Sequence, residues 1–323
     1  MSMIQRALVT GAAGFIGSLL CGDLLKQGYQ VVGVDCLRPY YPLEIKRASL
    51  RSLEEQPRFE FHELDLCADD LKPAVASADL VFHQAARPGV RSSWAEGFEG
   101  SLRDNVLATQ RLLEAARDSS VQRIVYASSS SVYGRVATTQ MREDGPVRPF
   151  SPYGVTKLSA EQLCTVYAEN WGLPTVSLRY FTVYGPRQRP DMATHRLIQA
   201  ALRGTEFPLY GSGEYVRDFT YVDDIVEANI AAATASLAPG TILNIAGGAI
   251  VSMNELIFAV EAETGKPIRI ADEGTKAGDV ARTEADLSRA RALLSWRPTT
   301  SLQEGVARQV EWHRSNQDLL SSA

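Results

Sequence analysis

The chain has 323 residues and a formal net charge of −5, with 45% hydrophobic and 22% charged residues. This length and composition predict about two globular units built around a sizeable buried core. The negative charge gives no general attraction to nucleic acid or to an anionic membrane surface, and no stretch approaches the roughly 20 apolar residues of a membrane span.

Short apolar runs alternate with helical patterns through the first 180 residues. Runs typical of buried parallel strands lie at 7–9, 31–34, 80–82, 124–126 and 176–178. Segments with helical periodicity lie between and after them, at 15–27, 105–117 and 153–171. This alternation predicts an α/β fold, a doubly wound parallel sheet of the Rossmann type with right-handed crossovers.

The pattern changes after about residue 185, where glycine and proline separate shorter elements. A helix at 222–235 and a strand at 242–246 are expected to return to the main sheet. We therefore expect one domain formed by residues 1–185 with 220–249, and a smaller C-terminal α/β lobe formed by 186–219 and 250–323. No flexible linker separates the two, which favours a single unit with a cleft.

The four cysteines lie far apart and contain no C-x-x-C pair. This spacing argues against a metal site and against a disulfide framework, and it is typical of a reducing compartment. Glycines also interrupt the N-terminal apolar run too early for a signal peptide. We therefore expect a cytoplasmic protein with free, buried thiols at Cys21, Cys36, Cys67 and Cys164.

The first motif, TGAAGFIG, follows the first predicted strand and places Gly11, Gly14 and Gly17 where the chain enters a helix. Backbone at such a turn approaches a pyrophosphate closely, and the helix N-terminus offers free N–H groups. Asp35 ends the next strand, 18 residues after Gly17. A carboxylate there accepts hydrogen bonds from the adenosine ribose and repels a 2′-phosphate, which favours NAD over NADP. Arg38, which would favour a phosphate, we interpret as a solvated loop residue.

Tyr153 and Lys157 stand four residues apart on one predicted helix, so both project from the same face. A tyrosine phenol normally titrates near 10, and a lysine ammonium beside it favours the phenolate and lowers that pKa. The serine run 128–131 follows the fourth predicted strand, and one of its hydroxyls can hold the substrate oxygen whose proton moves. With NAD as hydride acceptor, these residues predict a proton-transfer unit.

Taken together, these motifs resemble the extended short-chain dehydrogenase/reductase family, and within it the nucleotide-sugar epimerases. The resemblance covers nearly the whole chain and includes TGAAGFIGSLL, YASSSSVYG, SPYGVTKLSAEQL, LRYFTVYGPRQRPDMA and VRDFTYVDDIVEA. It implies that Ser129 is the catalytic hydroxyl, Tyr153 the base and Lys157 its partner. It also implies a homodimer that pairs the helices at 105–117 and 153–171.

The resemblance implies two further sets of residues. The set that binds NAD is Gly11, Gly14, Phe15, Ile16, Gly17, Asp35, Asp65, Leu66, Ala85, Tyr153, Lys157 and Tyr180. The set that binds the nucleotide-sugar is Pro88, Arg91, Ser129, Ser130, Ser131, Thr182, Arg189, Arg217 and Asp279. Lys276 departs from the family pattern, since many UDP-glucose epimerases have arginine there.

Ser130 and Ser131 exclude some relatives. Dehydratases of the family carry Asp-Glu at these positions as an acid/base pair, and decarboxylases carry Glu in place of Ser131. Without a carboxylate, elimination chemistry lacks its proton carriers, so the serine pair favours epimerisation through a 4-keto sugar.

Two stretches, RPGVR after HQAA and FTVYGPRQRPDMA, are most similar to UDP-glucuronic acid 4-epimerases. Both bring arginines toward the sugar, and a hexuronate carboxylate needs a charge-assisted partner. Arg91 and Arg189 are the candidates, with Arg187 less favoured, and a structural ion pair is the alternative for each. The remaining alternatives are a UDP-glucose or UDP-N-acetylhexosamine 4-epimerase and, less favoured, a UDP-glucuronate decarboxylase or a non-catalytic NAD-binding regulator.

Overall fold

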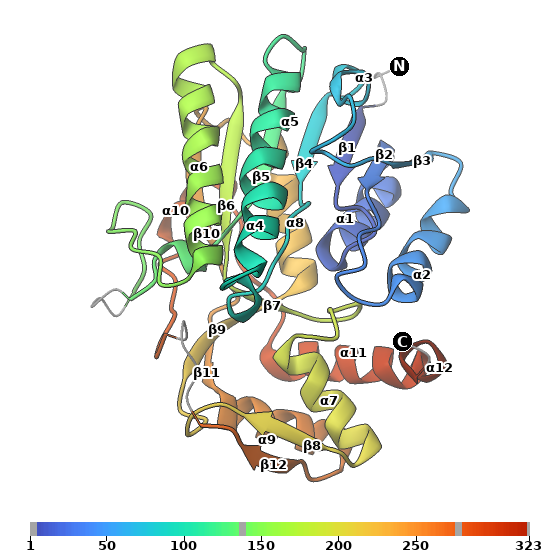
Figure 1. Ribbon diagram of the computed structural model, residues 1–323, viewed down its shortest axis with the longest axis vertical. Helices are drawn as coiled ribbons and strands as arrows, with labels where there is room; N and C mark the ends of the chain where they lie inside the picture. The colour runs from blue at the N-terminus through green and yellow to red at the C-terminus, as the bar shows by residue number, and fades with distance from the viewer. Residues whose placement is uncertain (1–4, 136–139, 275–279, 322–323) are drawn as a thin grey trace.

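A computed structural model describes residues 5–135, 140–274 and 280–321. Its largest sheet has seven parallel strands in the order β10-β6-β5-β4-β1-β2-β3 (Figure 1). These strands are β1 (Arg6–Thr10), β2 (Gln30–Asp35), β3 (Phe59–Glu63), β4 (Leu80–His83), β5 (Arg123–Ser129), β6 (Thr175–Tyr180) and β10 (Thr241–Ile245). The strand order reverses between β1 and β4, which confirms the predicted doubly wound sheet.

Helices cover both faces of this sheet. One face packs against α1 (Phe15–Lys26), α2 (Leu43–Glu54) and α8 (Val222–Thr234), and the other against α3 (Lys72–Ala76), α5 (Ala108–Ala116) and α6 (Pro152–Trp171). Successive side chains of β1 alternate between the two cores, with Ala7 and Val9 in the first and Leu8 in the second. Burial on both faces explains why the central strands read as continuous apolar runs.

Sequence patterns did not reveal β3, α2 or α3. The strand β3 has the sequence FEFHE and lies at the edge of the sheet, where its residues are only partly buried or exposed. The helix predicted at 105–117 is part of a longer helical segment. There α4 (Gly97–Ser101) continues through a π-helical turn at Leu102–Leu107 into α5.

The remaining elements form two small sheets and several helices. The sheets are β11-β9-β7 and β12-β8, with β7 (Thr182–Tyr184), β8 (Glu206–Leu209), β9 (Val216–Tyr221), β11 (Ala249–Ser252) and β12 (Arg269–Asp272). The helices are α7 (Ala193–Arg203), α9 (Met253–Thr264), α10 (Ser288–Leu294), α11 (Leu302–Ser315) and α12 (Gln317–Ser321).

Most of these elements lie together below the large sheet in Figure 1, whereas α10 packs against β10 and α8. The core that contains β1 continues into them through Leu197, Phe207, Val260 and Val306. The two parts therefore share one core, and the division of the chain at residue 185 stays a prediction.

The helix α6 has well-defined ends. Ser151 caps its N-terminus by accepting the N–H of Gly154 at 3.1 Å, Pro152 occupies the first turn, and Gly172 ends it with a φ of +66°. These ends fix the position of Tyr153 in the first turn. Across the described ranges, no helix is long and apolar enough to cross a membrane.

Candidate active site

A cavity of about 530 Å³ lies at the carboxyl ends of the central strands. Its walls include residues at or just beyond the carboxyl ends of the six strands β1 to β6. In that order these residues are Gly11, Asp35, Asp65, Ala85, Ser128 and Tyr180. Tyr153 and Lys157 of α6 and Arg189 of the β7–α7 loop complete it. Ligands of open α/β sheets bind at this edge, where the strand order reverses. The cavity therefore lies where the fold favours a ligand.

The glycine turn shapes one end of the cavity. Gly11 has a φ of +73°, and a Cβ on it would lie 2.8 Å from the backbone nitrogen of Ala85. A Cβ on Gly17 would lie 2.1 Å from the Gly11 carbonyl oxygen. Gly14 caps α1 without a side-chain hydrogen bond, so the helix N-terminus is left to backbone N–H groups. This geometry fits a dinucleotide pyrophosphate.

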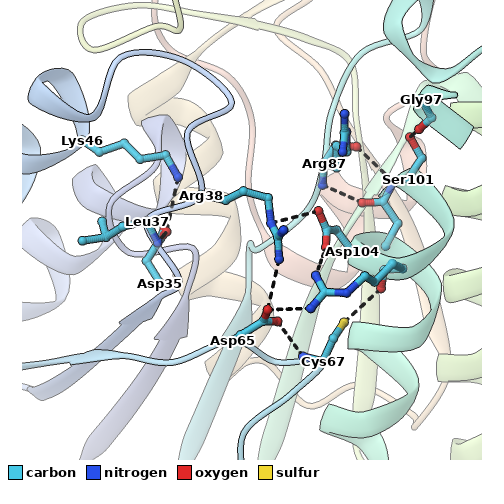
Figure 2. A network of polar contacts seen from close by, with 12 residues as sticks. Asp35, Leu37, Arg38, Lys46, Asp65, Cys67, Arg87, Gly97, Ser101 and Asp104 are labelled. Atoms are coloured by element: carbon cyan, nitrogen blue, oxygen red, sulfur yellow. Dashed lines mark hydrogen bonds and ion pairs between the residues drawn. The ribbon is translucent and has the colours of Figure 1, made fainter. Parts of the chain in front are cut away.

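Asp35 is held rigidly at the end of β2. Its carboxylate accepts the N–H of Leu37 at 2.8 Å and the N–H of Ala13 at 3.3 Å. The ammonium of Lys46, from α2, lies 3.3 Å from Asp35 Oδ1, and both side chains are nearly buried (Figure 2). A fixed carboxylate with a neighbouring donor is suited to the hydroxyls of a ribose.

Arg38 takes part in an ion-pair network beside that carboxylate (Figure 2). Its guanidinium lies 3.0 Å from Asp65 and 3.5 Å from Asp104, and Arg103 also donates to Asp65, at 2.6 Å. Burial raises the pKa of Asp65, but the hydrogen bonds from Arg103 and from the Cys67 N–H outweigh it and lower that pKa. Arg38 is therefore engaged by two carboxylates, which a 2′-phosphate would have to displace.

Tyr153 and Lys157 both line the cavity, one turn of α6 apart. Burial raises the pKa of Tyr153 above its usual value, while a hydrogen bond from Ser129 and the charge of Arg189 act in the opposite direction. Burial also lowers the pKa of Lys157 to about 7, and its ammonium lies 4.7 Å from the ring centroid of Tyr126. The expected lowering of the phenol pKa by Lys157 is therefore wrong: burial raises that pKa, and the opposing contributions come from Ser129 and Arg189.

The serines of the run 128–131 have different environments. Ser128 is buried, lines the cavity and donates to Glu161 Oε2 at 2.6 Å, which holds β5 to α6. Ser129 accepts the backbone N–H of Ser131 at 3.2 Å and hydrogen-bonds the Tyr153 phenol. Ser129 is therefore the hydroxyl of the run that contacts the phenol.

Arg189 is the arginine that the structure places beside Tyr153. Its Nε and Nη2 each donate to a carboxylate oxygen of Asp191 at 3.0 Å, and its guanidinium lies 5.9 Å from the ring centroid of Tyr40. A guanidinium carries five N–H donors, so the pair with Asp191 uses part of them. Arg189 is both ion-paired and a wall of the cavity.

The other two candidate arginines lie elsewhere. Arg91 is exposed and stacks on Tyr210, with 4.0 Å between the guanidinium and the ring centroid. Arg187 donates to the carbonyl oxygen of Ser49 and to Ser52 Oγ of α2, both at 3.5 Å. Neither arginine lines the cavity that the described residues enclose.

The remaining predicted site residues divide into two groups. Those that line the cavity are Phe15, Ile16, Leu66, Ala85, Pro88 and Tyr180. Those that the structure describes but that do not line it are Ser129, Ser130, Ser131, Thr182 and Arg217. Asp279 and Lys276 lie outside the described residues.

Residues 7–246 match the model of the NAD dependent epimerase/dehydratase family. The chain belongs to that family. The predicted family and its dependence on NAD are thereby confirmed. Within the ranges that the structure describes, no group of three or more His, Cys, Asp or Glu side chains is placed to hold a metal ion.

Three members of the epimerase/dehydratase family show where this chain lies within it. An uncharacterized UDP-glucose epimerase of Bacillus subtilis, YtcB, is 42% identical over 95% of this chain and 98% of its own. A UDP-glucuronate 4-epimerase of Thermodesulfobacterium geofontis is 38% identical over 98% of each chain. The crystal structure of UDP-glucuronic acid 4-epimerase from Bacillus cereus, in complex with UDP-glucuronic acid and NAD, has a TM-score of 0.93 and 42% identity, covering 96% of this chain and 99% of its own.

Sequence reasoning missed Lys46 and Tyr40, which also line the cavity. Tyr40 donates to the carbonyl oxygen of Pro88 at 2.8 Å, and it stands in a proline-flanked aromatic pair in the loop between β2 and α2, a signal that could have been used. Lys46 lies 11 residues beyond Asp35, on an amphipathic helix. Its local pattern is that of a surface lysine, so only the folded chain shows its role.

Proposed function

We propose that this protein is an NAD-dependent UDP-sugar 4-epimerase that interconverts UDP-glucuronate and UDP-galacturonate. The observation that carries the proposal is the placement of Tyr153 and the guanidinium of Arg189 on one cavity that also contains the glycine turn. The relatives from T. geofontis and B. cereus, which are named as UDP-glucuronate 4-epimerases, support the choice of sugar.

The residues of the glycine turn and of β2 fit the cofactor. The backbone N–H groups at the start of α1 would face the pyrophosphate, and Asp35 with Lys46 would hold the adenosine ribose. When bound, NAD supplies the acceptor and donor of a hydride. Substrate binding, proton transfer and orientation of the sugar would then be carried out by side chains of this protein.

Proton transfer would be carried out by Tyr153, with Ser129 holding the same substrate oxygen. A phenolate is needed to accept the proton of the sugar 4-hydroxyl, and the Ser129 hydrogen bond and the Arg189 charge both lower the pKa of Tyr153 against the opposing effect of burial. A protonated Lys157 adds positive charge in the same cavity. Positive charge and hydrogen bonding at the phenol therefore favour its base form.

The site must also protect the substrate from decarboxylation. A ketone at C4 is β to the C5 carboxylate, so the carbon–carbon bond breaks readily when it aligns with the ketone π system. Arg189 is proposed to grip the carboxylate away from that alignment. Ser130 and Ser131, standing where relatives carry Asp or Glu, add no acid or base that would promote elimination.

The decisive test is incubation of the purified protein with UDP-glucuronate, with the products followed by NMR. Formation of UDP-galacturonate without loss of carbon dioxide supports the proposal. The alternative is a UDP-glucose or UDP-N-acetylhexosamine 4-epimerase, favoured by the name of the B. subtilis relative. Faster conversion of either neutral sugar would replace the uronate assignment, and no turnover of any UDP-sugar would indicate a non-catalytic NAD-binding regulator.

The cofactor preference should depend on Asp35. Asp35→Ala should weaken NAD binding by about 1.5–3 kcal/mol, the usual range for hydrogen bonds to a charged group. Calorimetric titration with NAD and NADP measures the effect. Asp23→Ala, which removes a carboxylate from α1 outside the cavity, is the control and should bind NAD normally. Equal affinity of the wild-type protein for NAD and NADP would contradict this role.

We propose that the protein works as a homodimer that pairs α6 with the predicted segment 105–117, which contains α5, and with the π-helical turn before it; α5 and α6 lie side by side in Figure 1. Exposed apolar side chains support this, including Leu102 at 46% and Val155 at 48% exposure. Leu102→Arg should shift the protein to a monomer in light scattering. Phe258→Arg changes a more exposed apolar residue on α9, at 73%, and should stay dimeric. A monomeric wild type would disprove the proposal.

A cytoplasmic location is supported by the cysteines. All four are free; Cys21 and Cys164 are buried as expected, whereas the expected burial of Cys36 and Cys67 is wrong, since both are partly exposed. Unpaired thiols are typical of reducing compartments. Recovery of the enzyme in the cytosolic fraction of its source cells is expected, and recovery in the secreted fraction would contradict it.

A further inference from the structure

The loop between β7 and α7 carries Arg189 to the cavity wall. Its backbone is unusual, because Arg187 has a φ of +65° and Gly185 one of +139°. The left-handed region is disfavoured for a residue with a Cβ, so the surrounding structure has to hold it there. The contacts that hold this loop therefore bear on the position of Arg189.

Gln188, the residue before Arg189, points into the protein and is 1% exposed. Its Nε2 donates to the carbonyl oxygen of Val183 at 2.9 Å, and its Oε1 accepts the backbone N–H of His195 at 3.0 Å. Its own carbonyl oxygen lies 2.9 Å from His195 Nδ1. Gln188 thus ties the middle of the loop to β7 on one side and to α7 on the other.

Gln309 of α11 completes this arrangement from 121 residues away. It is fully buried, donates through Nε2 to Gln188 Oε1 at 2.8 Å, and accepts the backbone N–H of Gly185 at 3.0 Å. One side chain therefore holds both the first residue of the loop and the residue before Arg189. Buried amide networks in which donors and acceptors are matched are rigid, because every alternative leaves a polar group unpaired.

We infer that Gln309 is a positioning residue for the reaction, which through Gln188 keeps Arg189 facing the cavity beside Tyr153. The inference rests on the proposed function, since it assigns Arg189 to the sugar carboxylate. Gln309 does not line the cavity, so its effect reaches the substrate only through the loop. A displacement of about 1 Å at a reacting site can cost roughly 10²-fold in rate.

The test compares Gln309→Met, which keeps the length of the side chain and removes its amide, with the wild type and with Arg189→Ala. The measured quantity is the ratio of kcat/KM for UDP-glucuronate to kcat/KM for UDP-glucose. Gln309→Met should lower this ratio roughly 10-fold, as expected for a partly displaced guanidinium. In the double variant, the ratio should equal that of Arg189→Ala alone, because Gln309 then has no arginine left to position.

Gln199→Met is the matched control, since Gln199 donates to His313 at 2.8 Å in the same lobe and, among the described residues, does not hydrogen-bond Gly185 or Gln188 of the loop. It should leave the ratio unchanged. A second readout is the pH dependence of kcat. Because the charge of Arg189 lowers the pKa of Tyr153, displacing that charge should move the acidic limb of the profile to higher pH in Gln309→Met.

If Gln309→Met leaves the ratio of the two kcat/KM values unchanged, the inference is overturned. Equal losses of kcat/KM on both sugars would then mean that Gln309 has a purely structural role, and no loss on either sugar would mean that the loop does not depend on it. If Gln309→Met does not fold, Gln309→Asn, which keeps an amide on a shorter side chain, gives the same comparison. An unchanged ratio in Arg189→Ala would overturn the proposed carboxylate contact together with this inference. A lowered ratio in Arg189→Ala but not in either Gln309 variant would overturn this inference alone.

Discussion

Tyr153→Phe is expected to reduce kcat by about 10²–10⁴-fold, the usual contribution of positioned acid–base catalysis. The substitution removes only the phenolic oxygen, so binding of the UDP-sugar should stay nearly unchanged. Steady-state turnover gives the first quantity, and calorimetric titration with UDP-glucuronate gives the second. Turnover near that of the wild type would require a different base.

Tyr126→Phe is the matched control for this loss. Tyr126 lies under Lys157, and among the described residues its buried hydroxyl has no hydrogen-bond partner. Removing that hydroxyl keeps the ring against which Lys157 packs. Its turnover should therefore stay close to the wild-type value, and a comparable loss in both variants would point to a general disturbance of the core instead of a lost base.

The parts of the site that the sequence predicts are those in which neighbouring residues act together. To predict the glycine turn, it is enough to recognise a strand, three glycines and a helix in succession. To predict that Tyr153 and Lys157 share one face, it is enough to recognise a helix, because the two residues lie one turn apart. Both patterns are local, so the spacing along the chain already determines the geometry. The same holds for the central strands, whose burial on both faces gives continuous apolar runs.

Contacts between distant segments could not be predicted in this way. Lys46 pairs with Asp35 because α2, which packs beside α1 and β3, brings it to the end of β2, and Gln309 meets Gln188 across 121 residues. The edge strand β3 lacks an apolar run because its residues are half exposed. In each case the deciding quantity is a packing arrangement of the whole chain, which a local pattern does not contain.

The electrostatics of Tyr153, the proposed base, show the same limit. The spacing of Tyr153 and Lys157 correctly brings them to one cavity, and the ammonium was expected to lower the phenol pKa. Burial raises the pKa of Tyr153 and lowers that of Lys157 to about 7. The charge that counters this at Tyr153 comes from Arg189, 36 positions along the chain (189 − 153). The effect of burial on a pKa depends on all the atoms that surround the side chain, so it could not be predicted from the spacing of residues along the sequence.

The sugar specificity is expected to depend on Arg189. Arg189→Ala should lower kcat/KM for UDP-glucuronate relative to UDP-glucose by about 10–100-fold, because an interaction with a charged group is worth roughly 1.5–3 kcal/mol. Loss of its charge should also raise the pKa of Tyr153, which moves the acidic limb of the kcat profile to higher pH. Kinetics with both sugars across a range of pH measure the two effects.

Arg203→Ala is the control for the Arg189 variant. Arg203 is the last residue of α7, donates to the carbonyl oxygen of Leu320 at 2.6 Å and does not line the cavity, so its loss should not change the ratio between the sugars. Equal losses on both sugars in Arg189→Ala would mean that Arg189 is structural, as a partner of Asp191, or that it contacts the diphosphate.

The same variant separates two functions of a carboxylate contact. If Arg189 also turns the C5 carboxylate away from alignment with the C4 ketone, Arg189→Ala should release carbon dioxide and a UDP-pentose along with the epimer. NMR of the product mixture detects the pentose directly. Lost selectivity without this product would mean that Arg189 contributes binding alone. In that case protection against decarboxylation would have to come from elsewhere in the site, and Ser130 and Ser131, which stand where the dehydrating and decarboxylating relatives are expected to carry carboxylates, are the first residues to substitute.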